Sequence, residues 1–211
     1  MSDKATIEAT GIASAPPDVA RVRLVVFAED PAPGTALTSC SLVTERVLSA
    51  LRQAGVASSD LETASIDLSQ QHRRDEQDTF SYLASNSLVA TVRPPEDTGR
   101  VVAAAVDAAG TGITVHNVNF DIGDRTSVTA QARRDAVAKA ISAARELADA
   151  AGVVLGPLLE LAEGVRHRPQ PVGPRFMAAA RTVQSPPVEL GELGVAVTVT
   201  AVFGVEQTAA R

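Results

Sequence analysis

Two kinds of apolar spacing follow one another along this chain, and their order limits the fold more than any single motif does. Some segments place apolar residues at every second position, as a strand with one buried face does, and others repeat them every three to four residues, as a helix does. Strand spacing covers residues 6–13, 19–28, 62–71, 79–93, 113–122, 153–162 and 194–205, and helical spacing covers residues 35–54, 96–109 and 124–151. This order predicts an α+β protein in which helices cover one face of each sheet.

Turn and cap residues mark where these segments meet. Residues 14–18, Ser-Ala-Pro-Pro-Asp, are expected to join the first two strands, because prolines cannot donate to a sheet ladder and fix a turn. Gly55 and Gly152 follow two of the helical segments, in the position where glycine commonly ends a helix. Asp124 is expected to cap the long third helix, whose apolar positions include Val137 and Ile141.

The same order suggests two small helix-backed sheet units. We expect the first unit to be discontinuous, with residues 1–85 and 189–211, so that the C-terminal strand closes the first sheet and fixes both chain ends. An inserted α/β unit is expected at residues 86–165. Residues 166–188, rich in proline and arginine, form a loop or arm longer than the usual connections in compact domains.

Charge and composition exclude some partners. The net charge of −6 is opposite to that of proteins that bind a phosphate backbone, and five Phe, one Tyr and no Trp leave few rings for stacking on bases. We therefore expect no nucleic-acid partner. No apolar run approaches the ~20 residues that cross a bilayer, and the opening Met-Ser-Asp-Lys lacks the features of a secretory signal. We expect no transmembrane segment and a cytoplasmic location.

Five segments, in the same order along the chain, resemble the SIMPL-domain family. The first is residues 8–20, EATGIASAPPDVA, in which a glycine-bearing strand leads into a Pro-Pro-Asp turn. The others are residues 51–56 together with 60–63, then 82–88, 133–152 and 186–193. No single segment is diagnostic, but the five in register cover nearly the whole chain.

The resemblance implies two small α/β units, the first discontinuous and the second ferredoxin-like. Bacterial members of the family are mostly exported; they include a periplasmic immunogenic protein that builds large ring or barrel oligomers and have been linked to oxidative-stress defence. A mammalian member binds a signalling kinase. No catalytic residues are established for the family, so the resemblance assigns none to this chain, and the expected lack of a leader separates the chain from its exported relatives.

Residue types that carry metal, redox or nucleophilic chemistry are few and scattered. His72, His116 and His167 lack the spacing of metal ligands, so we expect no metal. Cys40 is the only cysteine and has no basic residue within four positions, so we expect a small buried residue rather than a reactive thiol. Residues 110–112, Gly-Thr-Gly, precede a strand and are not a dinucleotide-binding loop. We expect neither a cofactor nor catalytic residues.

Seven residues of the proline-rich arm are the candidate contacts with a partner or a second subunit. They are Arg166, His167, Arg168, Arg175, Phe176, Met177 and Arg181. Guanidinium groups suit carboxylate and phosphate partners. The apolar pair Phe176-Met177 is unusual for a loop that only contacts water, so we expect it to dock on a neighbouring subunit. The alternative is a solvated loop that its prolines hold away from the body of the protein.

Three functional interpretations remain open. The first is a non-enzymatic, self-assembling protein with a stress-related role, in which strand edges pair between chains. The second is a regulator that binds a small molecule or a protein partner in the cleft between the two units. The third is a hydrolase without a recognised motif, or a thiol antioxidant enzyme that uses Cys40.

Overall fold

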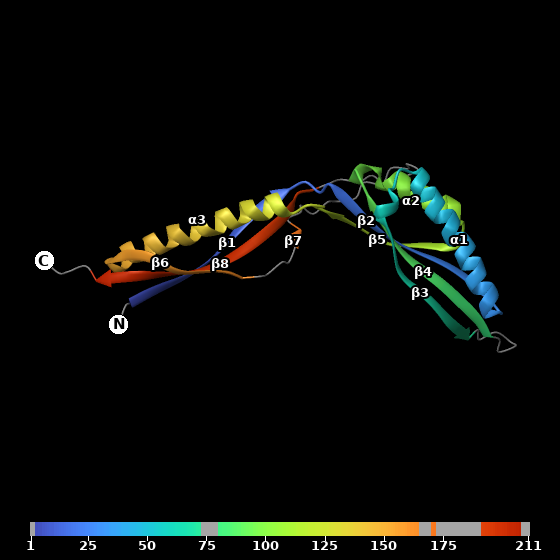
Figure 1. Ribbon diagram of the computed structural model, residues 1–211, viewed down its shortest axis with the longest axis horizontal. Helices are drawn as coiled ribbons and strands as arrows, with labels where there is room; N and C mark the ends of the chain where they lie inside the picture. Colours follow the sequence, from blue (N-terminus) through green and yellow to red (C-terminus); the bar gives the residue numbers. More distant parts are fainter. Residues whose placement is uncertain (1–2, 73–79, 165–169, 172–190, 208–211) are drawn as a thin grey trace, which may run out of the picture. The chain divides into compact units, whose positions relative to one another are not determined.

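The computed structural model describes residues 3–72, 80–164, 170–171 and 191–207. In this part of the chain, three α-helices and eight strands form two separate antiparallel sheet units; one helix covers a face of the first sheet and two helices cover a face of the second (Figure 1). The α+β class predicted from the sequence is confirmed. Each predicted strand and helix is also present, with its ends shifted by at most a few residues.

The first unit contains the first and the last strand of the chain. Its sheet has the order β1-β8-β6, formed by β1 (Asp3–Ala15), β8 (Leu193–Gln207) and β6 (Val153–Gly164), and the short β7 (Gln170–Pro171) pairs with one end of β8. β1 and β8 pair without interruption from Asp3 opposite Val205 to Ala15 opposite Leu193. The expected return of the C-terminal strand to the first sheet is therefore confirmed.

Helix α3 (Thr126–Ala151) covers this sheet at very short range. A Cβ atom on Gly11 of β1 would lie 2.1 Å from the carbonyl oxygen of Ala132 and 2.2 Å from the backbone nitrogen of Ala136. The buried face of the helix is a row of small residues spaced four apart: Val128, Ala132, Ala136, Ala140, Ala144 and Ala148. Val137 and Ile141 lie only partly buried beside this row, because a helix so close to a sheet leaves room beneath it for little more than a methyl group.

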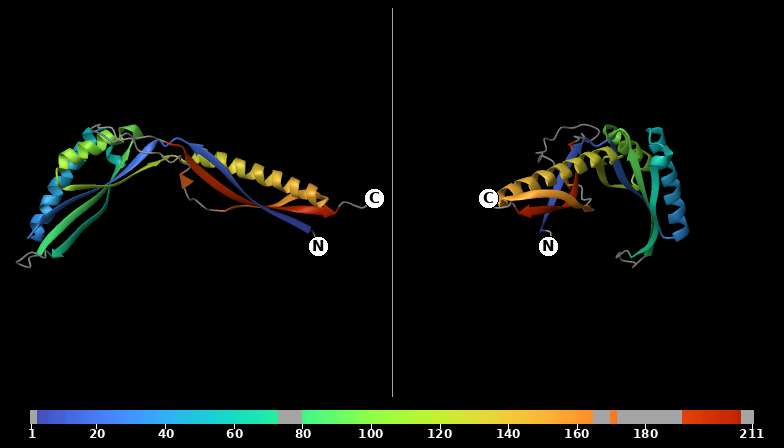
Figure 2. Two further views of the ribbon diagram at one scale, coloured as in Figure 1. Left: turned by 180° about the vertical axis from the view of Figure 1, so that it is seen from behind. Right: turned by 60° about the vertical axis from the view of Figure 1, so that its left-hand side comes forward.

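The second unit, residues 17–123, has the element order βαββαβ. Its elements are β2 (Val19–Asp30), α1 (Pro33–Gln53), β3 (Leu61–His72), β4 (Phe80–Val92), α2 (Thr98–Ala109) and β5 (Ile113–Asp121). The sheet order β3-β4-β2-β5 with both helices on one face is the ferredoxin-like arrangement (Figure 2). Its core lies between the helices and the sheet and includes Leu24, Val26, Leu51 and Leu88, all essentially inaccessible to solvent.

The unit boundaries differ from those expected from the sequence. The ferredoxin-like unit occupies residues 17–123 rather than 86–165, and β1 and β2 belong to different sheets rather than to one sheet within residues 1–85. The physical reason is that β4 and β5 occupy both edges of β2, so β1 has no edge of β2 to join. The Pro-Pro-Asp segment therefore links two sheets instead of closing a hairpin.

Candidate functional site

The arm residues proposed as contacts lie outside the part of the chain that the structure describes. These are Arg166, His167, Arg168, Arg175, Phe176, Met177 and Arg181. Their role in binding a partner or a second subunit stays a prediction. Of the same loop, Gln170 and Pro171 are described, and they pair with Gly194 and Leu193 at the start of β8.

Cys40 lies on the buried face of α1 and is 4% exposed. Its Sγ lies 3.6 Å from the carbonyl oxygen of Val26 on β2. Burial raises the pKa of the Cys40 thiol, and a hydrogen bond with Thr44 opposes that change in part. Since the thiolate is the nucleophile, this environment disfavours reactivity. The prediction that Cys40 is a small buried residue is confirmed.

We expect Cys40 of the folded protein to react slowly with iodoacetamide near pH 8. Alkylation should be slower than in urea by about tenfold or more, because each unit of pKa above the solution pH lowers the thiolate fraction tenfold and burial also blocks access. A Leu42→Cys variant is the matched control, since Leu42 lies on the same helix and is 57% exposed. Mass spectrometry of timed samples measures both rates. Equal rates at positions 40 and 42 would contradict the expectation.

The three histidines are not brought together in the described structure. His72 lies at the end of β3, where its ring packs against Phe80 with the ring centroids 4.9 Å apart. His116 is exposed and is the extra residue of a bulge in β5, while His167 lies outside the described residues. Among the residues that the structure describes, no three His, Cys, Asp or Glu side chains lie close enough together to hold a metal ion.

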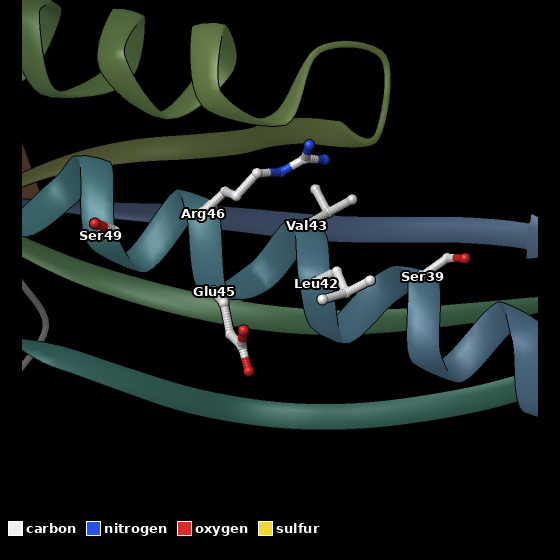
Figure 3. Close-up of a pocket in the computed structure, with 6 residues that line it drawn as sticks. All are labelled: Ser39, Leu42, Val43, Glu45, Arg46 and Ser49. Carbon is white, nitrogen blue, oxygen red and sulfur yellow. The ribbon is translucent and has the colours of Figure 1, made fainter.

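A hollow of about 560 Å³ lies along the outer side of α1 (Figure 3). The described residues that line it are Ser39, Leu42, Val43, Glu45, Arg46 and Ser49. Val43 and Arg46 point to the side on which α2 and β5 lie, whereas Glu45 points to the opposite side. Binding pockets usually direct a few polar groups toward one ligand. Here the carboxylate of Glu45 and the guanidinium of Arg46 diverge, so these two charged groups do not converge on one ligand.

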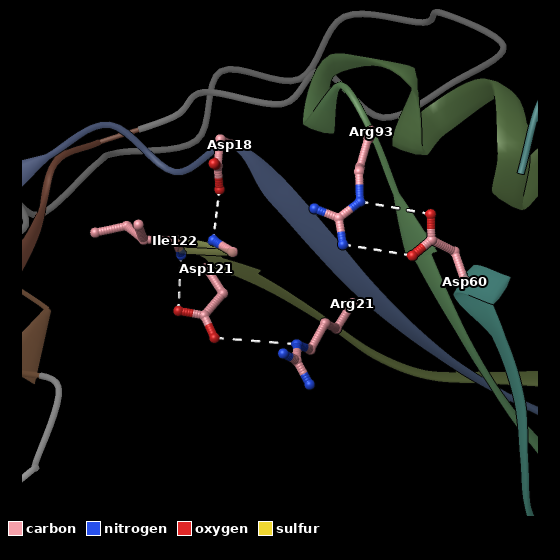
Figure 4. A network of polar contacts seen from close by, with 7 residues as sticks. Asp18, Arg21, Asp60, Arg93, Asp121 and Ile122 are labelled. Carbon is pink, nitrogen blue, oxygen red and sulfur yellow. Dashed lines mark hydrogen bonds and ion pairs between the residues drawn. The ribbon is translucent and has the colours of Figure 1, made fainter. Parts of the chain in front are cut away.

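Asp18 of the Pro-Pro-Asp segment joins the points at which the chain enters and leaves the second unit (Figure 4). Its backbone N–H donates to the carbonyl oxygen of Asp121 at 3.1 Å, and its Oδ1 accepts from the N–H of Gly123 at 2.6 Å. Asp121 Oδ1 in turn accepts from the N–H of Ile122 at 2.8 Å. The two bonds of Asp18 fix the start of β2 to the end of β5, so the motif has a structural role here.

The strand edges are the remaining candidates for a functional surface. β1 and β6 lie at the ends of one sheet, and β3 and β5 lie at the ends of the other. The outer edge of a strand presents backbone donors and acceptors, which can pair with a strand of another chain unless the protein covers them. The four edges differ in how they are covered.

The middle of the β1 edge is covered by side chains of α3. The N–H of Ile12 donates to Asp135 Oδ2 at 3.0 Å, and Lys139 Nζ donates to the carbonyl oxygen of Thr10 at 3.4 Å. Lys139 also lies 2.7 Å from Asp135 Oδ2. Two hydrogen bonds lower the pKa of Asp135: the one with Lys139 has the larger effect, and the one from the N–H of Ile12 has the smaller. The Asp135–Lys139 pair therefore occupies the positions that another strand would need.

Two other edges are irregular. β6 loses register with β8 at two places around Leu158 and contains Pro157, which has no N–H to donate. β5 has the bulge at His116, opposite Arg23 and Leu24 of β2. Bulges and prolines are features by which proteins keep sheet edges from pairing with other chains.

The β3 edge is regular and has an apolar side. From Ser65 to His72 it pairs with β4 in unbroken register. Ile66 and Leu68 lie on the helix-covered side of the sheet but are 68% and 43% exposed, because α1 lies over β4 and β2 instead. Phe80, opposite His72, is 54% exposed. Sequence reasoning missed this surface; the only signal was the alternation of Ile66 and Leu68 within a polar strand.

We expect an Asp135→Ala variant to self-associate more strongly than the wild type. Removing the carboxylate leaves the Ile12 N–H without its acceptor and detaches Lys139 from the edge of β1, so another strand can pair there. Light scattering at several protein concentrations measures the change, with Asp149→Ala on the exposed end of the same helix as control. An unchanged mass for Asp135→Ala would show that this pair does not protect the edge.

The first unit should lose stability in acid. Hydrogen bonds with the side chain of Thr126 and then with its backbone N–H lower the pKa of Asp124 from the ordinary 3.8, and the pKa of Asp135 is lowered from the same value. A carboxyl group with a lowered pKa stabilises the fold when the pH is above its unfolded-state pKa. This stabilisation is lost as the pH falls through the folded-state pKa. Urea unfolding between about pH 6 and pH 2.5 should show this loss below about pH 4. An Asp135→Asn variant should show a weaker dependence; an identical one would contradict the assignment.

The similarity of this chain to known proteins extends over both units. The model of the family SIMPL, described as a protein of unknown function (DUF541), matches residues 5–203. The 26 kDa periplasmic immunogenic protein of Brucella abortus (strain S19) is 32% identical over 208 residues, covering 93% of this chain and 82% of the relative. Its counterpart in Brucella melitensis biotype 1 is 31% identical with the same coverage. None of the described helices is long and apolar enough to span a membrane.

Proposed function

This chain belongs to the SIMPL family, whose function is unknown, and from that premise we propose that it is a non-enzymatic protein that assembles with copies of itself. The observation that carries the proposal is the edge of β3, where Ile66 and Leu68 are exposed beside backbone groups that have no neighbouring strand among the described residues. Burying apolar surface contributes about 25 cal/mol per Å². An uncovered apolar edge of this kind is therefore stabilised by a partner.

The non-enzymatic part of the proposal draws support from the positions of the reactive residue types. Cys40, the only thiol, is buried and has a raised pKa. His72 and His116 lie on strands at opposite ends of one sheet. Catalysis by a nucleophile or a general base needs such groups within hydrogen-bonding reach of one another or of a common substrate.

The mass of the purified protein in solution tests the proposal. Size-exclusion chromatography with light scattering should give a mass at least twice the 21.8 kDa of one chain, with little change on dilution through the micromolar range. A mass of one chain at all concentrations would refute self-assembly. Incubation with peroxide, with and without Cys40→Ser, tests the enzyme alternative, because loss of peroxide removal in that variant would indicate thiol chemistry.

The arm predicted from the sequence adds a second contact to this proposal. If Phe176 and Met177 dock on a neighbouring subunit, deleting residues 168–182 should lower the mass measured by light scattering. A double substitution to serine at these two positions is the finer test, since it keeps the length of the arm. An unchanged mass in both variants would exclude the arm from assembly.

Location, stress response and ligand binding between the two units stay predictions. The name of the relatives places those proteins in the periplasm, whereas we expect a cytoplasmic location for this chain from its sequence. Fractionation of native cells with an antibody distinguishes the two compartments. Thermal-shift screening against metabolites and peptides tests the ligand-binding alternative, which requires at least one stabilising compound.

A further inference from the structure

We infer that the edge of β3 pairs with β3 of a second copy, antiparallel and about a two-fold axis at Ser69. This inference rests on the proposed self-assembly and names the surface that performs it. The paired segment is residues 66–72, which lie within the regular part of β3 from Ser65 to His72. Such pairing would join the two ferredoxin-like sheets into one continuous sheet with the helices of both copies on the same side.

The outward-facing backbone N–H and C=O groups of β3 are better suited to pairing with another strand than those of the other three edges. At β1, Asp135 and Lys139 already bond the outward groups of Ile12 and Thr10. Along residues 65–71, the side-chain hydrogen bonds run only between side chains of the strand itself, from Ser65 Oγ to Asp67 and from Gln71 to Ser69 Oγ. The outward donors and acceptors of this segment therefore have no intramolecular partner among the described residues and suit an added strand.

The apolar side chains also favour a strand as the occupant. On one side of the edge, Ile66 and Leu68 are exposed next to the ring pair of His72 and Phe80. An added strand places its own alternate side chains beside these, within the 4.5–5.5 Å that separates cross-strand neighbours. A small ligand could not satisfy the backbone groups and cover this row at the same time.

The negative charge of Asp67 decides which strand, and which register of that strand, fits the edge of β3 best. An axis at Asp67 would set two carboxylates directly opposite each other, and an axis at Ile66 or Leu68 would set them diagonally adjacent, which is unfavourable. With the axis at Ser69, each Asp67 faces Gln71 of the second copy, whose amide can donate to it. The two carboxylates are then four residues apart along the strand, roughly 13 Å, which is beyond the screening length of about 8–10 Å in ordinary salt.

The same register makes the apolar side self-complementary. Ile66 faces His72 of the second copy, and so approaches the ring pair that His72 forms with Phe80. Leu68 faces Gln70 of the second copy, with the two Leu68 side chains on diagonal positions. Pairs of a β-branched residue with a ring stabilise sheets. A second copy of this strand therefore meets both the polar and the apolar requirements of the edge.

Cross-linking tests the register. A Ser69→Cys variant should form a disulfide-linked dimer without reductant, because facing residues of antiparallel strands have Cα atoms about 4.5–5.5 Å apart, within the range a disulfide spans. Ser65→Cys is the control, since its two copies would lie roughly 27 Å apart in this register. The native Cys40 is buried and does not compete. Non-reducing electrophoresis gives the result; equal linking at both positions, or none at position 69, overturns the register.

A charge at the edge tests the surface. Leu68→Lys places two ammonium groups on diagonal positions, so the assembly should fall to half its mass or less. Leu147→Lys, at a 53% exposed leucine on α3, should keep the full mass. Circular dichroism confirms folding of both variants. A wild type that is monomeric refutes the proposed function itself. An assembled wild type with no loss of mass in Leu68→Lys and no linking at position 69 leaves self-assembly standing and overturns the assignment to β3.

Discussion

Gly11→Ala is expected to unfold much of the first unit, with a loss of at least about 3 kcal/mol in the free energy of unfolding. An added Cβ would lie 2.1 Å from the carbonyl oxygen of Ala132 and 2.2 Å from the nitrogen of Ala136. Both atoms belong to the helix backbone, so no side chain can rotate away to make room. α3 must move off β1, and the row of buried alanines then loses its packing against the sheet.

Thermal unfolding followed by circular dichroism measures this effect. For a unit of this size, 3 kcal/mol corresponds to a fall in Tm of roughly 12–24 °C. Gly164→Ala is the matched control in the same sheet, because a Cβ there would meet the carbonyl oxygen of Thr198 at an ordinary 3.7 Å. Hydrogen exchange should show the loss of protection in β1 and α3. Similar Tm values for the two variants would mean that the close approach of α3 to β1 is not essential.

Leu24→Ala should cost the second unit about 2–5 kcal/mol, the range measured for leucine truncations in well-packed cores. Leu24 lies on the central strand β2 with no exposed surface, facing α1 and α2. Its removal leaves a cavity that β4 and β5 on either side keep from collapsing. Leu42→Ala removes the same atoms from a 57% exposed position on α1 and should change the stability by less than about 0.5 kcal/mol.

Urea unfolding of both leucine variants provides the measurement. The midpoint of the Leu24→Ala transition should fall while the slope, which reports the surface exposed on unfolding, stays the same. A loss below about 1 kcal/mol for Leu24→Ala would indicate that the core between sheet and helices is loosely packed. Because Leu24 is remote from the β3 edge in the strand order, the variant should assemble as long as it is folded.

The burial of Cys40 and the α+β class could both be predicted from the sequence. In β2, the alternation of Val22, Leu24 and Val26 with arginines at positions 21 and 23 indicates a strand with one buried face, and the structure has that face in the core. Cys40 has no charged neighbours within four positions of the chain, which is typical of a buried site. Such predictions succeed because spacing and local charge are properties of a short segment.

The candidate surface could not be predicted in the same way. Ile66 and Leu68 have the spacing of a buried face, yet they are exposed because α1 lies over neighbouring strands. The coverage of β1 by Asp135 and Lys139 joins residues more than 120 positions apart in the chain. Neither fact has a local sequence signal.

The sequence alone determined which segments are strands and helices, because each segment shows in its own residues that it must bury one face. Only the tertiary structure decided which segments share a sheet. β1 and β2 are neighbours in the chain but belong to separate units, since β8 pairs with β1 and both edges of β2 are occupied. The physical reason is that backbone hydrogen bonds between strands are the same for every residue type, so partners are chosen by the packing of whole faces.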